Sequence, residues 1–102
     1  MNRPLQTRKL LTIVCEAALE KRLETELPQF GAHGYTISDA RGSGAHGRRD
    51  AAWPASANIR VEVLCDEAVA EAVIRHLEAR YFTTYQLVVF LSDVQVLRAE
   101  KF

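Results

Sequence analysis

The chain has 102 residues, of which 48% are hydrophobic and 25% charged, as is typical of a single globular domain. Its 13 basic and 13 acidic residues cancel, which argues against a general role in binding nucleic acid or a membrane surface. The longest apolar runs, such as residues 87–91, are too short to span a bilayer. No secretory signal is evident, so we expect a cytoplasmic protein whose two cysteines stay reduced.

The first half of the chain predicts a strand, a helix and a second strand. Residues 9–16, KLLTIVCE, are rich in apolar and β-branched side chains, as in a strand. An amphipathic helix is predicted next, ending near Pro28 and Gly31. Its apolar stripe, at spacings of four, four and three, consists of Leu19, Leu23, Leu27 and Phe30. Residues 35–41, YTISDAR, predict the second strand.

The second half repeats this order. Residues 58–65, NIRVEVLC, alternate apolar and polar side chains and predict a third strand. Asp66 is a candidate N-cap for a second helix. Residues 86–91 predict a fourth strand and residues 94–97 a short fifth. The second helix is predicted to bury Val69, Val73, Leu77 and Tyr81.

The two halves echo each other, because IVCE at 13–16 and VLCD at 63–66 each precede a helix. Two split β-α-β units indicate an α+β, ferredoxin-like β-α-β-β-α-β sandwich, with an antiparallel sheet and both helices on one face. In this fold the first and third strands pair antiparallel. Cys15 and Cys65 would then lie at opposite ends of the sheet, too far apart for a disulfide.

The segment DARGSGAHGRRD, residues 39–50, is rich in glycine and arginine. Its glycines let backbone N–H groups turn toward an anion, and its arginines offer forked donors. It is neither a P-loop, because it lacks the Gly-Lys-Ser/Thr ending, nor a dinucleotide fingerprint, because no helix follows directly. The residues alone leave two interpretations open: an anion-binding loop, or an exposed hairpin charged for solubility.

No catalytic or metal-binding motif is evident. The three histidines have no i, i+4 or His-x-His spacing, and neither cysteine has a Cys-x-x-Cys partner. His33 and His76 are therefore predicted to be surface residues, whereas His46 is a candidate because it shares the loop with the arginines. We expect a binding protein without enzymatic activity, cofactor or metal.

Three segments, KLLTIVCE, GYTISDARGSG and NIRVEVLCDEAVAEAVIRHL, together resemble the PII superfamily of regulatory proteins over residues 8–98. GYTISDARGSG is the most specific, since a Gly-x-Thr-hydrophobic segment is followed by a basic residue and by a Gly-x-Gly that opens the family's T-loop. The resemblance implies a homotrimer with adenine nucleotides in clefts between subunits. It also implies a single domain with a flexible T-loop at about 42–57, and the tails 1–7 and 99–102 are candidates for disorder.

The resemblance assigns nucleotide-binding roles to seven residues. Thr36 matches the residue that hydrogen-bonds the adenine, Leu64 an apolar residue near the base, and Glu62 a site residue on the adjacent strand. Arg98 matches an arginine that reaches the phosphates across the subunit boundary. The base of the T-loop, along which the nucleotide lies, corresponds to Gly42, Ser43 and Gly44.

Departures from the family pattern point away from the nitrogen regulators. YFTTYQL replaces the glycine-rich B-loop, Leu87 stands where its lysine would be, and Glu100 lies near the place of a second arginine. Fewer cations should weaken γ-phosphate binding, so ADP or AMP is expected to bind better than ATP. These features resemble the PII-like branch linked to inorganic-carbon uptake and carboxysomes, whose members respond to adenine nucleotides and bicarbonate.

Bicarbonate is small, planar and singly charged, which suits forked arginine donors and loop N–H groups. The candidate bicarbonate ligands are Arg41, His46, Arg48 and Arg60. We expect a switch in which ligand orders the T-loop and changes its affinity for a partner such as a bicarbonate transporter or a carboxysome component. The alternative is a trimeric protein of similar fold that binds divalent cations.

Overall fold

The computed structural model describes residues 3–44, 47–49 and 57–102, and of residues 43–44 and 47–49 it describes the backbone only. The elements in chain order are β1 (Gln6–Glu16), the 3-10 turn η1 (Ala17–Leu19), α1 (Glu20–Gln29), β2 (Thr36–Ala40), β3 (Gly42–Gly44), β4 (Gly47–Arg49), β5 (Asn58–Cys65), α2 (Glu67–Arg80), β6 (Val88–Val96) and the 3-10 turn η3 (Ala99–Lys101).

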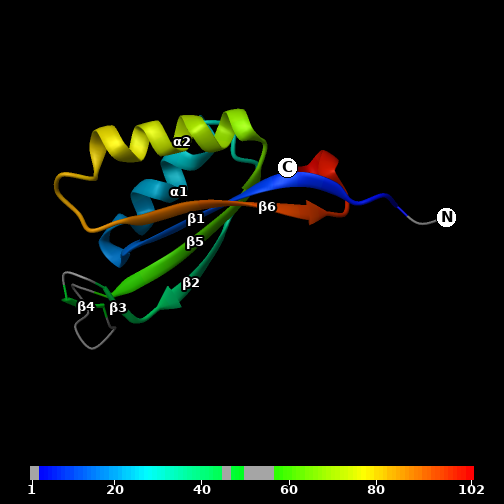
Figure 1. Ribbon diagram of the computed structural model, residues 1–102. Helices are drawn as coiled ribbons and strands as arrows, with labels where there is room; N and C mark the ends of the chain where they lie inside the picture. Colours follow the sequence, from blue (N-terminus) through cyan, green and yellow to red (C-terminus); the bar gives the residue numbers. More distant parts are fainter. Residues whose placement is uncertain (1–2, 45–46, 50–56) are drawn as a thin grey trace.

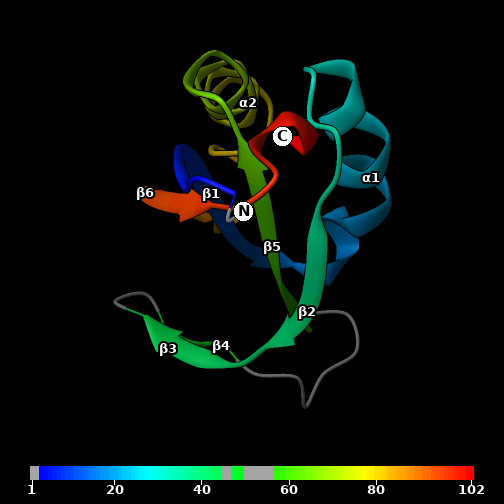
Figure 2. The same ribbon diagram turned by 90° about the vertical axis from the view of Figure 1, so that its right-hand side faces the viewer.

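Four strands form one antiparallel sheet in the order β2-β5-β1-β6, and α1 and α2 cover one of its faces (Figures 1 and 2). The predicted ferredoxin-like α+β fold is thereby confirmed. β3 and β4 form a separate two-stranded ribbon beyond one end of the sheet (Figure 1). No described helix lies on the opposite face of the sheet, which we call the open face.

The core lies between the helices and the sheet, because alternate residues of each strand point to the same side. The strand residues buried there are Leu11, Ile13, Cys15, Ile59, Val61, Val63 and Cys65. Both predicted helical stripes face this layer, with Leu19, Leu23, Leu27, Val73, Leu77 and Tyr81 buried and Phe30 and Val69 partly buried. The apolar residues that alternate along the strands and those that form the helical stripes therefore pack together in one core.

The helix ends follow local chemistry. The Asp66 side chain accepts a hydrogen bond from the Val69 backbone N–H at 2.9 Å, which confirms the predicted N-cap of α2. α1 ends at Gln29, and Gly31 beyond it has a φ of +98°, a conformation that favours glycine. A Cβ at Gly31 would lie 3.2 Å from Val69 Cγ2, so helix packing also favours glycine here.

β6 is one continuous strand over Val88–Val96, and the prediction of two short strands at 86–91 and 94–97 was wrong. The polar Asp93 interrupts the apolar pattern of the sequence, but it does not interrupt the pairing with β1. Its carboxylate Oδ1 accepts a hydrogen bond from Lys9 Nζ at 2.6 Å across the two strands. Pairing with β1 therefore stabilises β6 as one strand, and the residue pattern of β6 alone contains no information about this pairing.

Cys15 and Cys65 are both buried and form no disulfide with each other. Cys15 lies opposite Ile59 in the register, and Cys65 lies opposite Lys9, so the two thiols sit near opposite ends of the β1–β5 pair. At about 3.4 Å per residue this separation is roughly 20 Å, beyond the reach of a disulfide.

Parts of the two tails belong to regular elements. β1 begins at Gln6, and residues 99–101 form η3, in which Ala99 is 4% exposed. No helix among the described residues combines the length and the apolar composition needed to cross a membrane.

Candidate functional site

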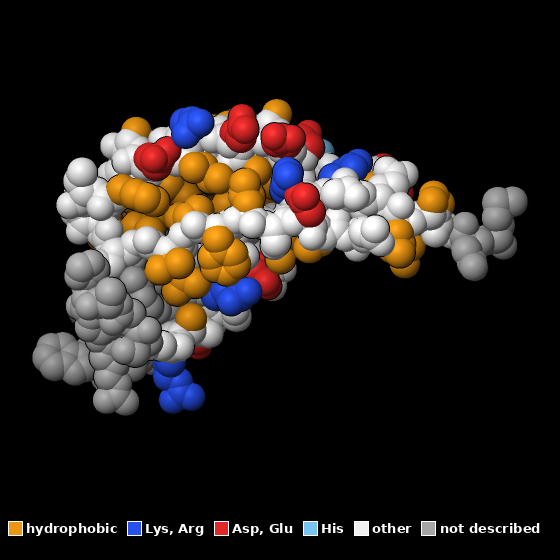
Figure 3. Space-filling model, viewed as in Figure 1, with side chains coloured by type: hydrophobic (Ala, Val, Ile, Leu, Met, Phe, Trp, Pro, Cys, Tyr) orange, Lys and Arg blue, Asp and Glu red, His pale blue; other side chains and the backbone are white. Residues whose placement is uncertain are grey.

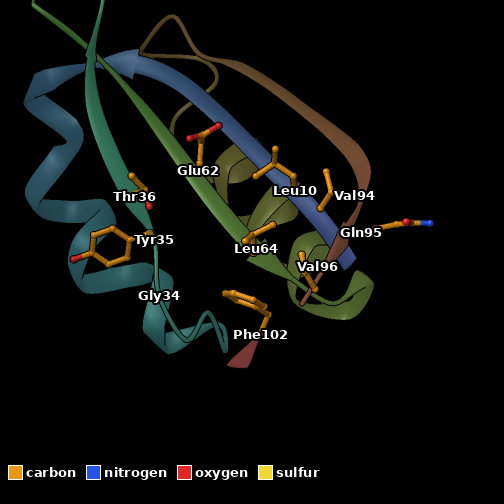
Figure 4. Close-up of a pocket in the computed structure, with 10 residues that line it drawn as sticks. All are labelled: Leu10, Gly34, Tyr35, Thr36, Glu62, Leu64, Val94, Gln95, Val96 and Phe102. Atoms are coloured by element: carbon orange, nitrogen blue, oxygen red, sulfur yellow. The ribbon is translucent and has the colours of Figure 1, made fainter. Parts of the chain in front are cut away.

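A cavity of about 430 Å³ lies on the open face of the sheet (Figure 4). Its volume falls within the range of small-molecule sites. Alternate residues of β1, β5 and β6 form an apolar floor of Leu10, Leu64, Val94 and Val96. Thr36 and Glu62 add a hydroxyl and a carboxylate, and Gly34, Tyr35 and Phe102 lie along the rim.

Three of the predicted nucleotide-binding residues meet in this cavity: Thr36, Glu62 and Leu64 (Figure 4). The sheet register explains why. Thr36 lies directly opposite Glu62 on the neighbouring strand, and Leu64 follows Glu62 by two residues, which returns it to the same face. Residues that are 26 positions apart in sequence therefore form one polar edge beside an apolar floor.

Arg60 extends this row along the open face of β5. Its Nη2 lies 3.5 Å from Glu62 Oε2, and the two side chains are 43% and 36% exposed. An ion pair this exposed contributes little to stability, because water screens it. Separating the Arg60 guanidinium from Glu62 should therefore cost little free energy.

The glycine-rich segment forms the β3–β4 ribbon, which begins one residue after β2. Its backbone pairs Gly42 with Arg49, Ser43 with Arg48 and Gly44 with Gly47. Arg41 and Gly42 are exposed at the start of the ribbon. The side chains of Ser43 and Arg48, and all of His46, lie outside the described part of the chain.

Arg98 does not line the described cavity. It follows β6 in a left-handed conformation, with φ 59° and ψ 50°. β6 starts beside Val14, near the ribbon, and ends beside Gln6, roughly 27 Å away at about 3.4 Å per residue. Within one chain, Arg98 and the ribbon are thus at opposite ends of the sheet.

Several residues that line the cavity were not predicted from the sequence. Leu10, Val94 and Val96 follow from the register once the pairing of β1 is known, because they share the face of Leu64. Tyr35 belongs to the GYT segment of the family resemblance, but no role was predicted for it. Its hydroxyl donates to Glu24 Oε2 at 3.3 Å, and desolvation together with the Glu24 charge raises the pKa of the phenol. No sequence signal pointed to Phe102.

A second polar cluster lies between the helices, on the side of the sheet opposite to the cavity. Tyr81, 1% exposed, donates through a hydroxyl 2.7 Å from both Glu26 carboxylate oxygens. His76 Nε2 lies 2.7 Å from Glu26 Oε1, and Arg80 Nε lies 3.5 Å from Oε2. The prediction that His76 is a surface residue was wrong, since its side chain is only 21% exposed and its ring is tilted against that of Phe30, with the centroids 4.7 Å apart.

The environment of Glu26 favours the ionised carboxylate. Burial alone would raise its pKa, but the hydrogen bonds from His76 and Tyr81 and the neighbouring positive charges outweigh burial and lower the pKa. This cluster ties α1 to α2. None of its residues lines the open-face cavity.

Among the described residues, no group of three or more His, Cys, Asp or Glu side chains is arranged to hold a metal ion.

Solved structures of several proteins share this architecture over nearly the whole chain. A Thermus thermophilus protein assigned to PII-like signalling is 43% identical, with 96% of this chain and 97% of that one covered and a TM-score of 0.83. CPII from Thiomonas intermedia K12, bound to ADP and bicarbonate, is 28% identical, with 99% of each chain covered and a TM-score of 0.86. A second CPII structure, bound to ADP, AMP and bicarbonate, is 28% identical, covers 99% of this chain and 98% of its own, and has a TM-score of 0.87.

These neighbours define a class of ferredoxin-like regulatory proteins. The family model described as nitrogen regulatory protein P-II matches residues 8–101. The chain belongs to the P-II family, whose members are signalling proteins, and within it this protein is PII-like and resembles CPII. The family expected from the sequence is thereby confirmed.

Proposed function

We propose that this protein is a non-catalytic sensor that binds ADP or AMP in the open-face cavity, together with bicarbonate near the ribbon. Ligand binding changes the conformation of the T-loop, at about 42–57, and so signals to a partner such as a bicarbonate transporter or a carboxysome component. The observation that carries the proposal is the meeting of Thr36, Glu62 and Leu64 in one cavity of ligand size. The binding of ADP, AMP and bicarbonate by CPII supports it.

The chemistry of the cavity suits adenine better than guanine. The Glu62 carboxylate accepts hydrogen bonds, and the exocyclic amine of adenine donates them, whereas guanine presents an oxygen acceptor at the same position of the ring. The Thr36 hydroxyl can donate to a ring nitrogen beside that amine. Leu64 and Leu10 offer an apolar surface to the face of the base.

The turn before β6 supports a preference for ADP or AMP over ATP. Leu87, at the place of the family lysine, packs against the apolar core. A residue that points inward supplies no charge to a γ-phosphate, so this turn would not compensate the third phosphate. Arg60, beside Glu62, and Arg41, at the start of the ribbon, are the candidates to balance a shorter phosphate chain.

A homotrimer would complete the site. Hydrophobic side chains gather along β6, the edge strand, on the surface seen in Figure 3. Val88, Phe90 and Leu91 are 50%, 45% and 39% exposed there, and an apolar edge of this kind is commonly covered by another subunit. Arg98, remote from the ribbon of its own chain, would reach the phosphates bound to a neighbour.

Calorimetric titration with ADP, AMP and ATP, each with and without bicarbonate at constant pH and ionic strength, tests the proposal. We expect ADP and AMP to bind more tightly than ATP, and bicarbonate to change their affinity. Thr36→Val should weaken ADP binding by about threefold to tenfold, since it removes one hydrogen bond. Thr25→Val on the exposed surface of α1 is the matched control and should leave the affinity unchanged. No binding of any nucleotide to the unmodified protein would exclude the proposal.

Light scattering after gel filtration tests the assembly. The unmodified protein should elute as a trimer, and Phe90→Glu should shift it toward monomer, because a charge on the apolar edge opposes contact between subunits. A monomeric unmodified protein at micromolar concentration would contradict the trimer.

A further inference from the structure

The segment after β6 turns back onto the molecule (Figures 1 and 2). Its last residue, Phe102, lines the cavity. The turn depends on Arg98, which is the one non-glycine residue with positive φ among the described residues. Such a conformation is uncommon outside glycine and persists where the surrounding contacts enforce it. η3 comes directly after it and carries the chain to Phe102.

Contacts from two other parts of the chain hold this segment in place. Ala99 is 4% exposed, and its carbonyl oxygen accepts from Arg8 Nη2 of β1 at 3.4 Å. The His33 ring donates through Nδ1 to the Lys101 carbonyl oxygen at 3.3 Å. β1 and the turn before β2 therefore fix both ends of η3, which gives Phe102 a defined position.

The Phe102 ring lies beside Leu64 and Val96, at the end of the cavity opposite Glu62 (Figure 4). A ligand whose polar edge meets Thr36 and Glu62 would extend across Leu64 toward this ring. Phe102 is partly buried, so an aromatic surface remains available at the mouth. An aromatic ring beside an apolar floor is a surface that a planar base covers well.

We propose that Phe102 contacts the purine base of the bound nucleotide, and that residues 98–102 act as a strap that holds the ring at the cavity. The proposal rests on the proposed nucleotide site and adds to it a base-contacting residue that the sequence did not suggest. The strap closes the apolar end of the cavity, whereas Thr36 and Glu62 form hydrogen bonds with the polar edge of the base. The base would be held from both ends.

Calorimetry on Phe102→Ala tests the contact. We expect the Kd values for ADP and AMP to rise by about tenfold and by the same factor, because the lost contact involves the base and not the phosphates. Phe102→Tyr should retain affinity within about twofold, since it keeps the ring. Leu97→Ala, at an exposed position directly before the strap and outside the cavity, is the matched control and should bind as the unmodified protein does.

A fluorescence titration of Phe102→Trp gives a direct reading of the contact. We expect ADP to quench the new indole, with the unmodified protein and its one tryptophan, Trp53, as the baseline. Thermal unfolding without nucleotide checks that each variant is folded. Unchanged or tighter ADP binding by a folded Phe102→Ala variant would overturn the proposal, because the ring would then be a bystander or a competitor. That result differs from failure of the proposed function, in which the unmodified protein binds no nucleotide.

Discussion

The hydrogen bond from Tyr81 to Glu26 is expected to contribute strongly to stability, and Tyr81→Phe isolates it. The substitution removes one hydroxyl and keeps the ring that packs in the core. The hydroxyl lies 2.7 Å from both carboxylate oxygens of Glu26, whose side chain is 16% exposed. Water therefore has limited access to replace the lost donor.

The magnitude depends on the charge of the acceptor. A hydrogen bond to a charged group contributes about 1.5–3 kcal/mol, roughly twice the contribution of a neutral one. We expect Tyr81→Phe to lower the free energy of unfolding by about this amount near neutral pH. In a domain of this size the Tm would fall by roughly 6–24 °C.

Urea unfolding near neutral pH, followed by circular dichroism, measures the effect. Tyr35→Phe is the matched control, since its hydroxyl donates to Glu24 at 3.3 Å on the exposed surface and should contribute less than about 0.5 kcal/mol. The reasoning would be refuted if the two substitutions lowered the free energy of unfolding equally.

Acid should reduce the difference in unfolding free energy between Tyr81→Phe and the unmodified protein, because a neutral carboxyl accepts a weaker hydrogen bond than a carboxylate does. The pKa of Glu26 is lower in the folded protein than in the unfolded chain, so its stabilising effect is complete above the ordinary glutamate range. That effect is lost as the pH falls through the lowered folded value. Measurements in a pH series from about 7 to about 3 should therefore show the two unfolding curves converging. A constant difference across the series would mean that the ionised carboxylate is not the acceptor that matters.

Three further predictions concern the fold. Asp66→Ala should lower the free energy of unfolding by about 1 kcal/mol in urea titrations, because it removes the cap on Val69 N–H. Gly31→Ala should lower it by about 1–2 kcal/mol, since alanine disfavours a φ of +98° and its Cβ would approach Val69 Cγ2. Cys15 and Cys65 should resist iodoacetamide near neutral pH and react after unfolding, as followed by mass spectrometry, because both thiols are buried. Burial, and to a lesser extent the negative charge of Asp66, also raises the pKa of the Cys65 thiol. Rapid alkylation of either thiol in the folded protein would contradict its burial.

Local patterns in the sequence were sufficient for most of the elements. The alternation in NIRVEVLC predicted β5 over 58–65, and the structure has the same bounds. The Asp66 cap and the buried positions Leu23 and Leu27 also followed from spacing alone. Such features depend on neighbours within a few residues, so a single sequence contains the information needed to predict them.

The candidate site was only partly predictable. Thr36, Glu62 and Leu64 were named from the family resemblance, and the sheet register explains why they meet. Composition and periodicity alone left the glycine-rich segment open between an anion site and an exposed hairpin. The described backbone shows a paired ribbon, while the bicarbonate roles of Arg41 and Arg60 stay predictions.

The remaining features were decided by tertiary structure, because they depend on partners far apart in the chain. His76 meets Glu26 across 50 residues, and this contact turns an apparent surface histidine into part of a polar bridge between helices. β6 stays continuous because β1 supplies its hydrogen bonds on one side. Phe102 reaches the cavity because Arg98 reverses the chain and because Arg8 and His33 hold η3 against the sheet. Whether a polar or aromatic side chain is buried depends on the residues that pack against it, and these come together only when the helices and strands assemble.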